Sequence, residues 1–173
     1  MVEFIGQALG ILAVILGFVS FQMKTPKGIL IFQILASAVF AIHYLLIGAI
    51  TAMALNLLGC IKCGVYYIRN KRGLSGFVAP AIFTTLTIIT SIMTWGGWVS
   101  ALIMVGLVVN TISLALPDAN KTRMFMFIKS PLCLAYNLLV KSGGGVIYEC
   151  AVLTSSLIGI ITNRKTKTNS EVH

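Results

Sequence analysis

The sequence predicts an all-α membrane protein with seven transmembrane helices, and two observations carry this prediction. First, 58% of the 173 residues are hydrophobic and only 10% are charged, whereas a soluble domain usually carries about 25% charged residues. Second, the apolar residues form long blocks of about 20 residues, the length that a helix needs to cross a bilayer. A soluble helix would instead show its apolar residues as a stripe along one face.

Polar or glycine-containing junctions separate the blocks. Gly48 marks a tight turn, residues 69–73 form a basic loop, and two tryptophans in residues 95–98 suit the membrane–water interface. A polar loop runs to Arg123, and residues 143–145 form a triple-glycine turn before the last block. The predicted spans are 4–22, 29–47, 49–68, 77–94, 99–116, 124–140, which Pro131 interrupts, and 146–162.

The chain ends and the cysteines show which further features a protein of this class is expected to have or to lack. Residues 1–3 lack the basic region of a signal peptide, so the first block is expected to remain as a helix. Residues 163–173 are polar and basic, and are expected to form a mobile tail. The four cysteines all lie inside apolar blocks, so they predict no disulfide framework, and Cys60-x-x-Cys63 lacks the further ligands of a zinc site.

The formal net charge of +9 has an asymmetric distribution along the predicted topology. Basic residues of loops favour the cytoplasmic side of a membrane. One side carries ten of them and the other carries Lys141. We therefore expect the N-terminus outside, the C-terminus in the cytoplasm, and no nucleic-acid partner. The ten are Lys24, Lys27, Arg69, Lys71, Arg72, Lys121, Arg123, Arg164, Lys165 and Lys167.

The two halves of the chain share one plan. A shift of 93 residues places the first three spans on the last three without a gap, and each half reads helix, basic loop, helix, tight turn, helix. An odd linker helix between the halves makes them parallel repeats. The expected organisation is a first three-helix bundle (1–72), a linker helix (73–94), a second bundle (95–162) and a cytoplasmic tail (163–173).

Several short motifs stand out in the first half of the chain: residues 18–22 with Lys24, Phe32-Gln33, residues 43–49, Asn56 and Gly59. With these motifs the chain resembles the SWEET and PQ-loop superfamily, and more closely the YgjV family of the bacterial inner membrane. The Pro-Gln pair of the superfamily is absent. The resemblance implies a three-plus-one-plus-three fold, transport by rocking of the two bundles, and location in the bacterial inner membrane. SWEET-like proteins can assemble, so a homo-oligomer is left open.

Polar side chains inside apolar blocks are the candidate substrate contacts, because they are costly in hydrocarbon and usually face the bundle interior. SWEET-type sites often use asparagine in the third and seventh helices; here Asn56 and Glu149 occupy positions 93 residues apart. His43 and its repeat-related Tyr136, with the adjacent Asn137, are expected around them. Each has an alternative: a salt bridge to Lys141 or solvation for Glu149, an interhelical hydrogen bond for Asn56, and simple packing for His43.

Lys62 and Lys129 lie within spans, near the expected cytoplasmic ends. The favoured interpretation is that both snorkel, with their stems in the membrane and their ammonium groups at its surface. If both face inward instead, the site would prefer an anion or a carboxylate.

We expect transport of a small polar or charged solute at a midplane site between the two bundles. A non-transporting receptor and an accessory membrane protein on the same scaffold are the alternatives. The lipid bilayer is the other expected partner. No catalytic triad, phosphate loop or metal-ligand cluster is readable, so neither an enzyme nor a cofactor is expected.

Overall fold

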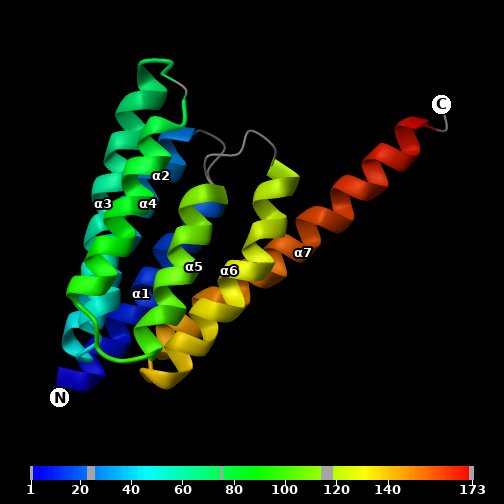
Figure 1. The fold of residues 1–173 in the computed structure, drawn as a ribbon. Helices are drawn as coiled ribbons and strands as arrows, with labels where there is room; N and C mark the ends of the chain where they lie inside the picture. The colour runs from blue at the N-terminus through cyan, green and yellow to red at the C-terminus, as the bar shows by residue number, and fades with distance from the viewer. Residues whose placement is uncertain (1, 23–25, 75, 114–118, 172–173) are drawn as a thin grey trace.

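The computed structural model describes residues 2–22, 26–74, 76–113 and 119–171 (Figure 1). Over these residues the chain folds into seven α-helices, so the all-helical prediction is confirmed. The helices are α1 (Val2–Gln22), α2 (Pro26–Leu46), α3 (Ile50–Lys71), α4 (Val78–Met93), α5 (Val99–Ser113), α6 (Ala119–Leu139) and α7 (Gly143–Glu171).

Two helices, α6 and α7, extend well beyond the apolar blocks that predicted them. Residues 143–145, predicted as a turn, form the first turn of α7, and the predicted tail continues that helix to Glu171. Backbone hydrogen bonding does not stop where side chains become polar, so hydropathy locates a helix better than its ends. Pro131 lies inside α6 without ending it, and the predicted end of the fifth span at residues 114–116 lies outside the described residues.

The turns between α2 and α3 and between α6 and α7 have the same backbone structure at positions 93 residues apart. Gly48 and Lys141 both adopt positive φ angles, of 75° and 55°. The amides of Ile47, Gly48 and Ala49 bond to the carbonyls of residues 43, 45 and 44, and those of residues 140, 141 and 142 bond to 136, 138 and 137. The bounds of α2 and α6, and the starts of α3 and α7, differ by the same 93 residues.

Packing divides the helices into two sets. In the first, α2 packs against both α1 and α3; in the second, α6 packs against both α5 and α7. The sets meet where α1 contacts α7 and where α3 contacts α5, while α4 packs on α3 and α5 (Figure 1). At the α1–α7 crossing, a Cβ atom on Gly144 would lie only 2.5–2.7 Å from the backbone of Gly10. Only glycine permits so close an approach of two helices.

Many polar side chains are buried in the interior beside an apolar core, and many large apolar side chains lie on the exterior. The largest fully buried side chains include His43, Asn137 and Thr111, whereas Ile61, Leu138 and many other large apolar side chains are exposed. In a water-soluble protein the charged and polar side chains would cover the surface. Among the described residues, one segment, Ile50–Arg69, is both long and apolar enough to span a membrane by these two criteria, and the other six helices contain shorter apolar segments.

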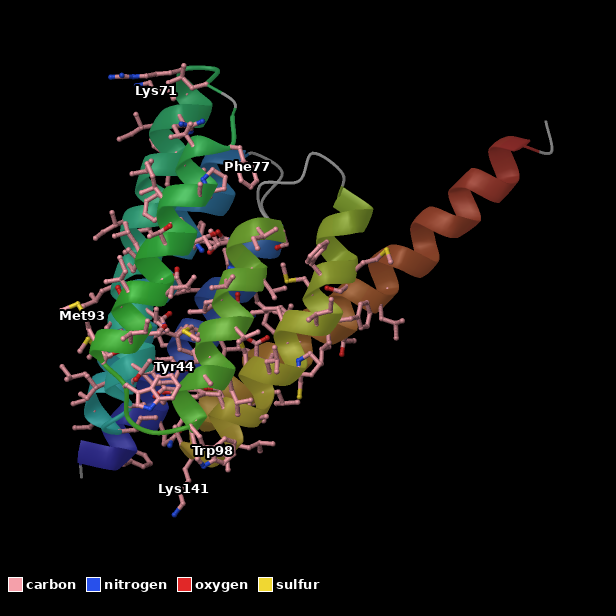
Figure 2. All side chains as sticks on the ribbon, in the orientation of Figure 1. Tyr44, Lys71, Phe77, Met93, Trp98 and Lys141 are labelled. Atoms are coloured by element: carbon pink, nitrogen blue, oxygen red, sulfur yellow. The ribbon has the colours of Figure 1, made fainter. Side chains whose placement is uncertain are left out.

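The two ends of the bundle can be followed in Figure 2. Lys71, the last residue of α3 and part of the predicted basic loop 69–73, lies at one end, and Trp98 and Lys141 lie at the other. We call the end that carries Lys141 the Trp98 end.

Candidate functional site

A cavity of about 400 Å³ lies within the bundle and is lined by side chains of all seven helices. Ligand pockets usually measure about 300–1,000 Å³, so this volume suits a small solute. The lining includes Asn56 of α3, Asn137 of α6 and Glu149 of α7. The structure thus brings three of the five predicted site residues to one space.

Glu149 is paired with Lys129 across the α6–α7 contact. The Lys129 ammonium donates a hydrogen bond of 2.6 Å to Oε1 of Glu149, and both side chains are buried. Lys129 also lies over the ring of Tyr148, 5.5 Å from its centroid. The alternative of a salt bridge between Glu149 and Lys141 is wrong, because Lys141 is exposed whereas the residue Glu149 is only 4% exposed. The second carboxylate oxygen, Oε2, is buried and has no hydrogen-bond partner among the described residues.

Lys62 also faces the cavity. Its side chain reaches from α3 to α5, where the ammonium donates a 3.2 Å hydrogen bond to the Thr111 hydroxyl. That hydroxyl donates in turn to the carbonyl of Leu107, so it is oriented to accept from Lys62. Counted over the whole residue, Lys62 is 8% exposed and Lys129 is 5% exposed. The snorkelling interpretation is therefore wrong for both lysines, because each reaches a polar partner inside the bundle.

Asn56 lines the cavity but bonds within its own helix. Its amide nitrogen donates to the carbonyl of Ala52 at 2.9 Å, and the side chain is half-buried. This bond uses one of the two amide N–H groups and does not use the amide oxygen. Asn56 therefore offers an acceptor, and one remaining N–H, to a solute in the cavity.

His43 lies beside the cavity rather than in its lining. It is fully buried, with Nδ1 2.7 Å from the carbonyl oxygen of Gly6 and Nε2 2.7 Å from the Ser142 hydroxyl. Because a carbonyl only accepts, Nδ1 carries the proton, and neutral His43 then accepts from Ser142 at Nε2. The imidazole thus joins α1, α2 and the α6–α7 turn. Tyr136 is likewise buried in the core and outside the lining.

Asn137 lines the cavity together with Tyr44, which was not among the predicted site residues. The hydroxyl of Tyr44 donates a 2.6 Å hydrogen bond to the amide oxygen of Asn137. These two residues stand 93 positions apart, so equivalent positions of the two halves contact each other directly. The pair lies beside His43, whose ring centroid is 4.9 Å from that of Tyr44.

Further hydrogen bonds join the two sets of helices at the Trp98 end. The amide nitrogen of Gln7 donates to the carbonyl of Lys141 at 2.8 Å, and the amide of Gly143 donates to the Gln7 oxygen at 3.1 Å. On the opposite side, the Thr51 and Ser100 hydroxyls are 3.1 Å apart. Gln7 and Ser100 are 93 residues apart, so each set contributes one side chain that holds the start of the other set's third helix.

Sequence patterns contained a signal for part of this lining. Gln33, Ser37, Phe40 and Tyr44 recur at helical spacing, and all four line the cavity. The same spacing in α3 was less specific, because Asn56 and Cys63 line the cavity and Cys60 and Tyr67 do not. The thiols of Cys60 and Cys63 bond to α2, at Ile34 and Gln33. No group of three or more metal-binding side chains occurs among the residues that the structure describes.

Exposed large apolar side chains around an interior that buries charged and polar groups, in an all-helical bundle, define the chain as a helical membrane protein. The family model of Imp-YgjV, a family described as bacterial inner membrane protein, matches residues 4–167 of this chain. The chain therefore belongs to the YgjV family of bacterial inner membrane proteins. No curated protein and no solved structure matches this chain.

Proposed function

We propose that this protein is a transporter of a small polar or charged solute, which binds in the cavity between two three-helix bundles. The observation that carries the proposal is the cavity itself: about 400 Å³ of space inside a membrane protein, lined by Lys62, Lys129, Glu149 and three asparagines. Ionisable groups buried within a membrane protein usually mark a pathway for solute or ions.

The bundles of the proposal are α1–α3 and α5–α7, with α4 as the linker, as in SWEET-like proteins. Three features support it: the turns with matching hydrogen bonds, the helix bounds that differ by 93 residues, and the paired contacts α1–α7 and α3–α5. A twofold axis along the membrane normal accounts for all three, because it exchanges one bundle for the other.

The proposed topology is multi-pass, with the N-terminus outside and the C-terminus in the cytoplasm. The Trp98 end would then face outward. Lys71 and the rest of the basic loop lie at the opposite end, and basic loops favour the cytoplasm. Interfacial tryptophan at the outer end agrees with this assignment.

Alternating access requires that one end be closed while the other admits solute. The hydrogen bonds of Tyr44 with Asn137, His43 with Ser142, and Gln7 with the α6–α7 turn all join the bundles at the proposed outer end. They form an outer gate in this proposal. His43 and Tyr136, expected as substrate contacts, are assigned to this gate and to the core, whereas Asn56, Asn137 and Glu149 remain the proposed contacts.

The test is uptake of radiolabelled solutes into proteoliposomes, with two glycine variants of α3 as a matched pair. Gly59 lines the cavity, so Gly59→Leu places a side chain in the solute's space and abolishes uptake. Gly64 is outside the lining, and a Cβ atom at this position would have no other atom within 4 Å, so Gly64→Leu retains uptake. Binding without uptake in the wild type indicates a receptor, and neither binding nor uptake indicates an accessory protein.

A further inference from the structure

The cavity contains an unbalanced charge. Its lining includes two lysines and one carboxylate, and Lys129 with Glu149 forms the salt bridge. Among the described side chains, no carboxylate lies within the 4.0 Å ion-pair distance of Lys62. The lining therefore has a formal charge of +1. An uncompensated ion is costly inside a protein, because the interior polarises far less than water.

The environment of Lys62 leaves donors for a ligand. An ammonium has three N–H donors, and one of them is directed to Thr111. The side chain is more than nine-tenths buried, and it shares the cavity with Asn110 and Gln33, whose amides are neutral. A carboxylate beside Lys62 would balance its charge and accept one or both of the remaining N–H groups.

The second carboxylate oxygen of Glu149, Oε2, is a hydrogen-bond acceptor that no described residue uses. Oε2 is buried without a partner among the described residues, and an ionised carboxylate oxygen only accepts hydrogen bonds. The carboxylate charge is already balanced by Lys129. A neutral donor, such as a hydroxyl, satisfies Oε2 without adding charge, whereas a cationic amine would restore the imbalance.

We propose that the solute is a small hydroxycarboxylate monoanion, with its carboxylate at Lys62 and a hydroxyl donating to Oε2 of Glu149, an assignment that rests on the transport function proposed above. A monoanion brings the formal charge of the occupied cavity to zero. The volume of about 400 Å³ equals about thirteen water molecules at roughly 30 Å³ each. A three- to six-carbon hydroxy acid fits this space.

The experiment compares four three-carbon probes that differ in their charged groups: glycerate, glycerol, the zwitterion serine and the amino diol serinol. Each is tested for stabilisation of the purified protein against heat and for uptake into proteoliposomes. Glycerate should stabilise the wild type most and should be taken up. Lys62→Gln should weaken glycerate binding at least about thirtyfold, the low end of the loss when a buried charge pair loses one partner. Lys62→Arg retains the charge and should retain glycerate binding.

The outcomes separate the two proposals. Preference for glycerol, serinol or serine, together with uptake, overturns the assignment of an anion and leaves the transport function intact. Absence of stabilisation and uptake with all four probes overturns both. Lys62→Gln should not lower the melting temperature of the solute-free protein, because it removes an unbalanced buried ion. A large fall in that temperature, with glycerate binding retained in the residual folded protein, also overturns the role of Lys62.

Discussion

Removing the carboxylate of Glu149 should lower the free energy of unfolding, because the buried Lys129 ammonium would lose its ion partner. Lys129 and Glu149 are 2.6 Å apart, and their side chains are 7% and 6% exposed. In Glu149→Gln the Lys129 ammonium stays buried but loses its ion partner. Breaking a buried ion pair at one side typically costs about 3–5 kcal/mol. We therefore expect the free energy of unfolding to fall by about 3–5 kcal/mol.

A double variant distinguishes loss of the pair from loss of packing. In Lys129→Met with Glu149→Leu, no charge is left without a partner, and apolar side chains of similar volume replace the pair. Such replacements are often neutral or stabilising, so this variant should unfold within about 1 kcal/mol of the wild type. The coupling energy of the double-mutant cycle should then be at least about 2 kcal/mol.

The assay is reversible unfolding of the purified protein in mixed micelles, followed by circular dichroism at increasing fractions of a denaturing detergent. Two results would refute the reasoning. One is a Glu149→Gln protein that unfolds within about 0.5 kcal/mol of the wild type, as an ordinary surface substitution does. The other is a double variant whose loss equals the sum of the single losses, since independent sites behave additively.

Three further predictions concern the packing, the gate and the topology. Gly144→Ala should lower the free energy of unfolding by about 1–3 kcal/mol through the clash with the α1 backbone, and the unhindered Gly64→Ala should raise it by up to about 1 kcal/mol; equal effects would contradict the close crossing. Tyr44→Phe loosens the outer gate, so an impermeant thiol reagent added outside should label cavity-lining Cys133 faster than in wild type; an unchanged rate argues against the gate. In a variant without native cysteines, Lys141→Cys should be labelled by an impermeant maleimide on intact cells, and labelling only after permeabilisation would reverse the topology.

The sequence predicted the number and order of the helices because each helix contains an apolar block that is favoured in the membrane over water. It located helix ends less well, since the polar residues of Ala119–Arg123 and the tail after Thr162 form helix without contributing to hydropathy. The shift of 93 residues was readable, and the structure has the same shift in its turns.

The charged interior was harder to predict. Lys129 and Glu149 lie on different helices, so only the tertiary packing of α6 on α7 shows that they meet. Whether a lysine near a helix end snorkels or turns inward depends on rotation of the helix about its axis, and Lys62 turns toward Thr111. Asn56 and Glu149 could be selected because single polar groups in apolar blocks are conspicuous. Tyr44 recurs at helical spacing with other lining residues, but its hydrogen bond to Asn137 of α6 is visible only in the tertiary structure.

In the proposed rocking of the two bundles, the close contact between Gly10 and Gly144 acts as the pivot. Gly10 lies eight residues after the start of α1 and twelve residues before its end, which at 1.5 Å per residue gives arms of roughly 12 Å and 18 Å. Any rotation about this point displaces the ends near Gln22 about one and a half times as far as the ends near Val2. A small parting of the hydrogen-bonded end is therefore matched by a larger sweep at the opposite end of the helix.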